Sequence, residues 1–348
     1  MKSSLRTILP SVIAISSCPR LTLAATNEGS FRRRTYFTNT AFISRHQFLS
    51  KTNSFPTLSP RTTLLAAQES RTASTSPTLF NPREPTIPIL TSMPEPLPPL
   101  RNYYYLLRHG QSTANVEGII SSARSLAGST EHGLTPLGQE QGTKSAGSLV
   151  DLIADDLLLE NGDGASFGSI GKSTKKVYFY SSPFARAEET ALKCLEGMRE
   201  TGEVVKKIEE LGLDVQDDVI LVDGLMERFF GRLDGKELAT YAYVWPVDMF
   251  MPTHTAFDVE SVAAVSTRIR STLLDIDSRY PEGGNHIVLT SHADVLQITQ
   301  CYAAGLENVG MFSQYRFGNG EVRKMGRDVG SLPEPVPLQP PKRGEFAA

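Results

Sequence analysis

Short apolar runs alternate with longer amphipathic segments along the middle of the chain. Runs of four or five residues rich in aromatic and β-branched side chains predict buried strands, and the longer segments between them predict helices. The predicted strands are residues 103–107, 177–180, 219–222, 286–290 and about 321–325, and the predicted helices are residues 136–156, 183–199, 259–279 and 292–304. This alternation indicates an α/β fold in which helices flank a mostly parallel sheet.

Two of the predicted strands lead directly to a histidine. The run 103–107 is followed by Arg108 and His109, and the run 286–290 precedes His292 by one residue. A buried guanidinium or imidazole needs polar partners, so packing alone does not explain these strand ends. Ligands of open α/β sheets bind outside the carboxyl ends of the strands. We therefore expect Arg108, His109 and His292 to face a ligand.

Two further charged side chains follow predicted strands. Arg186 comes after Ser182 and Pro183, which we expect to begin a helix with Ser182 as its N-cap. An arginine in the first turn adds a bidentate phosphate fork to a helix terminus that already favours anions. Glu227 stands after another strand, in the segment Glu-Arg-Phe-Phe-Gly. Taken alone, Arg186 would be a solvated helix residue, and the alternative for Glu227 is a surface carboxylate paired with Arg228.

The segment 106–115 resembles the signature of the histidine phosphatase superfamily, which includes the cofactor-dependent phosphoglycerate mutases. The signature residues in this chain are Arg108, His109, Gly110, Gln111, Ser112 and Asn115. The segments that contain Arg186, Glu227 and His292 match the same family in the same order. The resemblance implies a phosphoglycerate mutase-like fold, a three-layer α/β/α sandwich with a mostly parallel sheet and one antiparallel strand.

The resemblance also implies a phosphotransfer site. The implied catalytic residues are His109, Glu227 and His292, and the implied substrate-binding residues are Arg108, Ser112, Asn115, Arg186 and Arg228. His109 would carry the phosphoryl group as phosphohistidine, and Glu227 would supply and take up protons. Arginines can neutralise a phosphoryl group without a cation, so we expect neither a metal nor another cofactor.

The segment 232–258 helps to distinguish a phosphatase from a mutase. Its aromatic residues, which include Tyr241 and Trp245, either cover the leaving group or pack a surface subdomain. It contains no adjacent arginine pair, which the mutases use to hold a second acidic group. The pair Ala293-Asp294 also stands where the mutases have Gly-Asn. Both departures favour a metal-independent phosphomonoesterase of a small phosphorylated metabolite over a phosphoglycerate mutase.

A protein of this fold without catalysis, which only binds phosphate or serves as a scaffold, is the remaining alternative. It would be expected to lack a residue of the phosphate pocket, and no signature residue is missing here. The sequence does not indicate an oligomeric state.

Two carboxylates compete for the role of general acid. Glu227 matches the family's position, whereas Asp294 lies two residues after His292. In a more distant branch of the superfamily, an aspartate next to the second histidine is the proton donor. With Ser291 as N-cap, Asp294 would take the acidic position of a capping box, which would lower its pKa and make it a poor acid. We therefore predict Glu227 as the general acid.

The charge distribution divides the chain. Residues 1–80 carry a net charge of +8 with only two acids, whereas the remaining 268 residues carry −11. A basic stretch rich in Ser and Thr predicts that residues 1–75 are an organelle-targeting segment, for a plastid or alternatively a mitochondrion. A disordered tail without an address is the other interpretation. The apolar run 8–15 is too short to span a bilayer.

The remaining boundaries follow from proline and from composition. Eight prolines in residues 77–99 predict a linker at 76–100, which leaves residues 101–326 as the histidine phosphatase domain. Residues 327–348 are predicted to be a Pro-rich disordered tail. The acidic domain offers no basic face for nucleic acid, and we expect no membrane partner. Cys18, Cys194 and Cys301 have neither metal-ligand nor disulfide spacing.

Overall fold

The computed structural model describes residues 90–160 and 175–338. The predicted targeting segment, most of the predicted linker and the end of the predicted tail lie outside the described residues.

A mixed sheet forms the centre of the described part of the chain. Its strands are β1 (Tyr103–Arg108), β2 (Lys176–Ser181), β3 (Asp214–Leu221), β4 (His286–Ser291) and β5 (Val322–Lys324). They lie in the order β3-β2-β4-β1-β5. All neighbouring pairs are parallel except β1 and β5, which are antiparallel. The mostly parallel sheet with one antiparallel strand is therefore confirmed.

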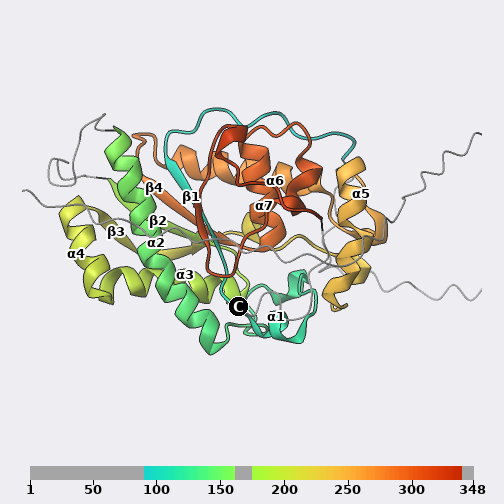
Figure 1. The fold of residues 1–348 in the computed structure, drawn as a ribbon, viewed down its shortest axis with the longest axis horizontal. Helices are drawn as coiled ribbons and strands as arrows, with labels where there is room; N and C mark the ends of the chain where they lie inside the picture. The colour runs from blue at the N-terminus through green and yellow to red at the C-terminus, as the bar shows by residue number, and fades with distance from the viewer. Residues whose placement is uncertain (1–89, 161–174, 339–348) are drawn as a thin grey trace, which may run out of the picture. The chain divides into compact units, whose positions relative to one another are not determined.

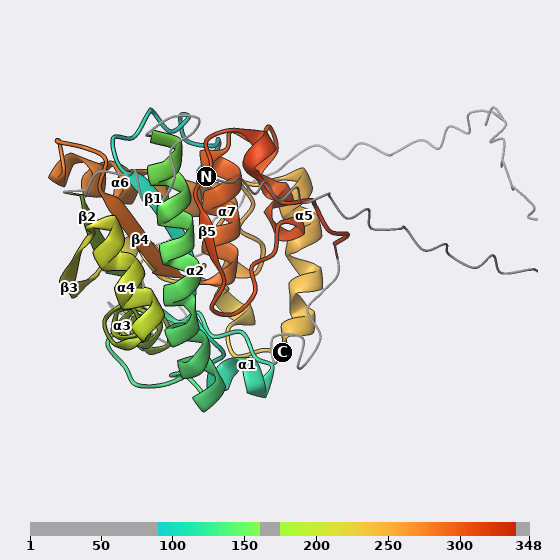
Figure 2. The same ribbon diagram turned by 60° about the vertical axis from the view of Figure 1, so that its left-hand side comes forward.

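Helices cover both faces of this sheet (Figures 1 and 2). The α-helices are α1 (Thr113–Glu117), α2 (Pro136–Glu160), α3 (Ala185–Glu200), α4 (Gly202–Leu211), α5 (Trp245–Phe250), α6 (Val262–Arg279) and α7 (Ala293–Ala303). Helices α2, α3 and α4 pack on one face, and α6 and α7 pack on the other. Short 3-10 turns include Leu238–Tyr243 and Val309–Gln314. These layers confirm the predicted α/β/α sandwich.

The two faces follow from the alternation of side chains along β1. Tyr104 and Leu106 are buried in the core that contains α6 and α7, whereas Tyr105 and Leu107 are buried in the core that contains α2 and α3. Successive residues of a strand point to opposite faces, so a strand buried on both sides must be apolar throughout. The continuous apolar run of β1 is the sequence signal of this central position.

The start of two helices differs from the prediction. Helix α3 begins at Ala185 with Phe184 as N-cap, and the Ser182 hydroxyl accepts the Phe184 N–H at 3.3 Å and also hydrogen-bonds His292. Helix α7 has His292 as N-cap, because the Ser291 hydroxyl donates instead to the Leu225 carbonyl at 2.6 Å. Both serines form tertiary hydrogen bonds, and neither is the N-cap residue of its helix as predicted. The helices α1, α4 and α5 were not predicted.

The described domain also extends beyond its predicted boundaries. In the predicted linker, Leu97 is buried, and its carbonyl accepts a hydrogen bond from Arg327 at 2.7 Å. In the predicted tail, Leu332 packs against the core, and the Val336 N–H donates to the Gln314 carbonyl at 2.8 Å. Residues 90–100 and 327–338 thus pack on the domain, because their few apolar side chains find partners there.

Cys194 of α3 and Cys301 of α7 are free and fully buried, as expected for small apolar side chains. Within residues 90–160 and 175–338, no helix is long and apolar enough to cross a membrane.

A buried histidine lies at the amino end of β4, far along the strand from His292. The His286 ring stacks on Tyr103 with centroids 5.6 Å apart, and its Nδ1 hydrogen-bonds the Tyr105 hydroxyl at 3.0 Å. That hydroxyl donates to Asp156 at 2.6 Å, so the imidazole is the donor in its bond to Tyr105. Burial lowers the pKa of His286 from 6.5 to about 4. The folded protein therefore holds this imidazole neutral.

We predict that His286 makes the fold less stable in acid. Below pH 6.5 the unfolded chain binds a proton at this histidine that the folded protein does not bind until about pH 4. The contribution is complete above pH 6.5 and is lost between these values, by on the order of 3 kcal/mol. Denaturant unfolding at several pH values should show a steeper acid loss in the wild type than in His286→Asn. Equal slopes in the two proteins would contradict the assignment.

Candidate active site

The end of β1 places the signature segment at the carboxyl edge of the sheet. Arg108 pairs with Ser291 of β4 in register, and the His109 N–H donates to the Ser291 carbonyl at 3.0 Å. His109 follows Arg108, and His292 follows Ser291. The two histidines therefore lie side by side at the end of the paired strands. This is the edge at which α/β sheets bind ligands.

Gly110 is required by the close approach of α2. A Cβ atom at Gly110 would lie 2.3 Å from the carbonyl oxygen of Gly138, and one at Gly138 would lie 2.1 Å from that of Gln111. No side chain fits into such a contact between backbones. The Gly110 N–H also donates to the Thr190 hydroxyl at 2.9 Å, which ties the segment to α3.

Two buried imidazoles face each other at this edge. The rings of His109 and His292 have centroids 5.2 Å apart. Nδ1 of His109 lies 2.7 Å from the Gly110 carbonyl, which can only accept, so Nδ1 carries the proton and Nε2 keeps the lone pair. Nε2 of His292 hydrogen-bonds the Ser182 hydroxyl at 2.8 Å, whereas its buried Nδ1 has no partner among the described residues. Burial, followed by the charge of Arg186, lowers both pKa values well below 6.5.

Two buried arginines lie near these rings. The Arg108 guanidinium donates to the Phe317 carbonyl at 2.6 Å, and Arg186 donates to the Ser121 hydroxyl at 3.1 Å and to its carbonyl at 2.8 Å. Both side chains are buried. Burial lowers the pKa of each to about 10, so both remain charged at neutral pH. Charged guanidiniums held in this way can bind phosphoryl oxygens.

Ser112 and Asn115 form the first turn of α1. The Ser112 hydroxyl accepts the Asn115 N–H at 3.3 Å, and the Asn115 side-chain oxygen accepts the Ser112 N–H at 3.1 Å, which is a reciprocal capping box. Asn319 also donates to this oxygen at 3.3 Å. The side-chain N–H groups of Asn115 thus face the pocket, because its oxygen is held on the other side.

Glu227 and Asp294 both reach this pocket. Burial raises the pKa of Glu227, and the nearby charge of Arg186 opposes the shift. Burial also raises the pKa of Asp294 to about 7, although Arg228 opposes it. Asp294 is the second residue of α7 and accepts from the Trp245 indole at 3.3 Å, so the predicted capping box and the low pKa are wrong. Burial thus favours the protonated form of both carboxyls.

Arg228 lies behind the pocket and does not line it. Its guanidinium donates to both Asp248 carboxylate oxygens at 2.7 Å and to the Glu260 carbonyl at 2.7 Å, and it is fully buried. His254 adds a further bond to Asp248 at 2.8 Å. The predicted substrate-binding role of Arg228 does not fit this position, since its donors already hold α5 and the segment before α6. Its charge faces Asp294 at 3.4 Å.

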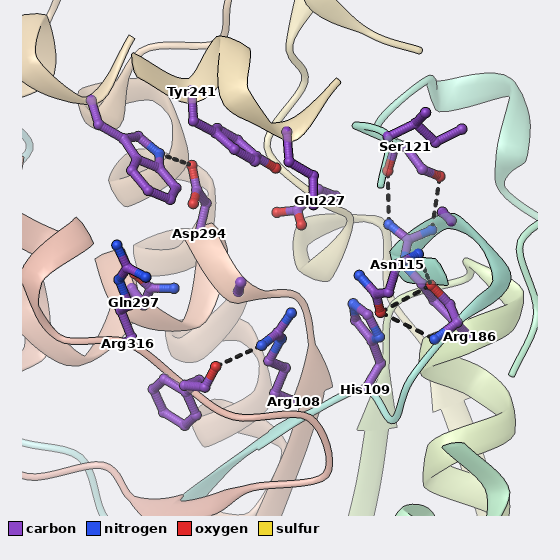
Figure 3. Close-up of a pocket in the computed structure, with 17 residues that line it drawn as sticks. Arg108, His109, Asn115, Ser121, Arg186, Glu227, Tyr241, Asp294, Gln297 and Arg316 are labelled. Atoms are coloured by element: carbon purple, nitrogen blue, oxygen red, sulfur yellow. Dashed lines mark hydrogen bonds between the residues drawn. The ribbon is translucent and has the colours of Figure 1, made fainter. Parts of the chain in front are cut away.

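The pocket collects most of the predicted residues (Figure 3). Those that line it are Arg108, His109, Ser112, Asn115, Arg186 and Glu227. His292 is not among the lining residues, but its ring packs against that of His109. The aromatic segment contributes Tyr241, which stacks on Trp245 with ring centroids 4.5 Å apart, whereas Tyr243 and Phe250 are exposed.

Other lining residues were not singled out from the sequence. They are Ile119, Ser121, Leu238, Gln297, Arg316 and Phe317. No motif marks them, because they come from loops and helix faces that only the fold brings together. Among the described residues, no group of three or more His, Cys, Asp or Glu side chains is arranged to hold a metal ion.

Two solved structures illustrate what the chain resembles. A mycobacterial glucosyl-3-phosphoglycerate phosphatase has 20% sequence identity and a TM-score of 0.44, over 64% of this chain and 89% of that chain. The alpha-ribazole phosphatase from Shigella flexneri has 20% identity and a TM-score of 0.41, over 63% of this chain and 88% of that chain. No curated relative matches the sequence.

The family model of the histidine phosphatase superfamily (branch 1) matches residues 169–331. This range contains Arg186, Glu227 and His292, and the signature segment with Arg108 and His109 precedes it. The matched residues, somewhat less than half of the chain, are thus similar to the histidine phosphatase superfamily (branch 1).

Proposed function

We propose that the protein is a metal-independent phosphomonoesterase that hydrolyses a small phosphorylated metabolite through a phosphohistidine. One observation carries the proposal: the neutral His109 imidazole, with its proton on Nδ1, is buried beside the charged guanidiniums of Arg108 and Arg186. The two arginines offset the negative charge that otherwise repels a nucleophile from a phosphate ester. The imidazole is already in the protonation state that a nucleophile needs.

The first step forms a bond between His109 Nε2 and phosphorus and breaks the ester P–O bond. The leaving oxygen takes a proton from a carboxylic acid of the pocket. In the second step, water attacks phosphorus, the N–P bond breaks, and the same carboxylate takes the proton of the water. Nδ1 of His109 keeps its hydrogen bond to Gly110 throughout, which stabilises the charge that the ring acquires when phosphorylated.

Glu227 is the proposed general acid. Its carboxyl interacts most strongly with Arg186 and also with Arg108, whereas Asp294 interacts most strongly with Arg228 and then with Glu227. Electrostatic interaction falls with distance, so Glu227 lies closer to the place of the phosphoryl group. The charge of Glu227 in turn raises the pKa of Asp294 by like-charge repulsion.

Two features support hydrolysis rather than mutase chemistry. The segment 232–258 supplies no arginine to the pocket, since Arg232 is exposed and pairs with Asp258 at 2.9 Å. Arg228, the next arginine in the chain before Arg232, is bound by Asp248. The pocket therefore lacks the arginine pair that the mutase pattern requires.

The nucleophile assignment predicts that His109→Ala abolishes turnover of p-nitrophenyl phosphate. The variant should also lose acid-labile labelling by a phosphorylated substrate, because it lacks Nε2 of His109, the proposed phosphoryl acceptor. His46→Ala, which removes a histidine outside the described residues, is the matched control and should stay active. Activity should persist in EDTA. Normal turnover by His109→Ala would contradict the mechanism.

The proton assignment predicts different responses of two isosteric variants. Glu227→Gln should lower kcat about 10²-fold or more on an alkyl phosphate, and much less on p-nitrophenyl phosphate, whose leaving group needs no acid. Asp294→Asn should retain more activity. The reverse pattern would assign the acid role to Asp294.

A further inference from the structure

The segment that carries Glu227 is neither helix nor strand. Residues 226–230 lie between the 3-10 turns Asp223–Leu225 and Gly231–Leu233, and the Glu227 carboxyl points into the pocket (Figure 3). The carboxyl accepts the Arg228 N–H at 2.9 Å, which is a bond within the same segment. A general acid must stay within hydrogen-bond reach of the oxygen that it protonates, and a displacement of about 1 Å is costly. The backbone around Glu227 must therefore be held from outside the segment.

Glu260, which lies just before α6, makes such contacts. Its N–H donates to the Phe229 carbonyl at 2.8 Å, and its carboxylate accepts the Phe229 N–H at 3.1 Å. The Glu260 carbonyl accepts a hydrogen bond from Nε of Arg228 at 2.7 Å. Glu260 therefore bonds the two residues that follow Glu227, through its backbone and through its side chain.

Two arginines connect the Glu260 carboxylate to further parts of the segment. Arg268 of α6 donates to Oε1 of Glu260 at 2.8 Å and to Oε2 at 3.1 Å, and it also donates to the Gly224 carbonyl at 2.6 Å. Arg124, in the chain after α1, donates to Oε2 of Glu260 at 3.0 Å and to the Glu227 carbonyl at 3.1 Å. The backbone is thus held before Glu227, at Glu227 and after it.

Glu260 is a buried charge beside the pocket. Burial raises the pKa of its carboxyl, but the charges of Arg268 and Arg124 outweigh burial and hold that pKa below its ordinary value. A buried carboxylate is tolerated when it is paired and hydrogen-bonded, and such a network makes the backbone that it joins more rigid. Glu260 is not among the residues that line the pocket. Its effect on the reaction would therefore pass through the segment of Glu227.

We propose that Glu260 is a positioning residue for Glu227. Together with Arg124 and Arg268, it holds the backbone of residues 224–229 so that the Glu227 carboxyl stays at the leaving oxygen. This inference rests on the proposed phosphatase function. It adds a residue that touches neither the substrate nor the reacting atoms.

Glu260→Gln tests this role, because the variant keeps the size of the side chain and removes its charge. In the full-length protein we expect kcat on an alkyl phosphate to fall about tenfold or more, since a displaced acid protonates the leaving oxygen poorly. KM should change little, because Glu260 does not touch the substrate. Turnover of p-nitrophenyl phosphate, whose leaving group needs no acid, should fall much less. Equal losses on both substrates would indicate a general structural defect and would overturn the proposal.

A double variant shows whether Glu260 acts through Glu227. In a Glu227→Gln background, Glu260→Gln should lower kcat on the alkyl phosphate no further, because the group that it positions is already absent. Losses that multiply would mean that Glu260 acts by another route, which would overturn the proposal.

Two further variants control for charge and for folding. Asp275→Asn removes an exposed carboxylate of α6 that pairs with Arg279 at 2.6 Å, and it should leave both activities unchanged. Arg124→Lys keeps the charge but lacks the planar fork that bonds both Glu260 and the Glu227 carbonyl. It should show the same substrate-dependent loss to a smaller extent, and it replaces Glu260→Gln in every comparison if that variant does not fold.

Crystal structures of the wild type and Glu260→Gln give a readout that needs no turnover. In the variant, the Glu227 carboxyl should move by roughly 1 Å or more, or occupy more than one position. If the wild-type protein hydrolyses no ester, p-nitrophenyl phosphate included, the phosphatase proposal fails and this comparison alone decides the positioning role. A Glu227 carboxyl that stays in place would overturn it.

Discussion

The parallel pairing of β1 with β4 is the constraint on which the site depends. Because Arg108 and Ser291 pair in register, the chain leaves the sheet at the same edge twice, each time at a histidine. The two imidazoles are thereby buried together, with ring centroids 5.2 Å apart. Burial disfavours the charged form of a histidine, so this geometry alone moves both rings toward neutrality.

The arginines respond differently to the same burial. A guanidinium has so high an intrinsic pKa that burial leaves it charged, provided that its N–H groups are hydrogen-bonded. The Phe317 carbonyl and Ser121 meet that condition for Arg108 and Arg186. Their charges lower the pKa of His109 further. One pocket therefore holds neutral imidazoles beside charged guanidiniums.

Strand positions and the residues at strand ends could be predicted from the sequence, because both are local properties. The run before Arg108 is continuous and apolar, so the central strands were predicted correctly. The residues predicted from the signature to bind the phosphoryl group line one pocket. The helix starts at Ser182 and Ser291 could not be predicted, because the hydroxyl of each serine is engaged in a contact outside a helix cap.

The surroundings of the site depended on partners that are distant in sequence. Arg228 was predicted to bind substrate, but Asp248 lies twenty residues later and binds it within the core. Asp294 was predicted to have a low pKa from its place in a helix, whereas burial in the assembled pocket raises that pKa to about 7. Arg316 belongs to a loop with no motif, and contacts such as the bond of Arg108 to the Phe317 carbonyl hold that loop at the pocket.

The account requires that His109 is neutral, with its proton on Nδ1, before substrate arrives. Nitrogen-15 NMR of the histidine-labelled protein, recorded between about pH 5 and pH 8, measures the protonation state and tautomer of each ring. His109→Gln and His292→Gln proteins assign the two signals. We predict that both rings stay neutral at pH 6 and that Nε2 is the unprotonated nitrogen of His109. A His109 that is protonated at pH 6, or that carries its proton on Nε2, would contradict the account.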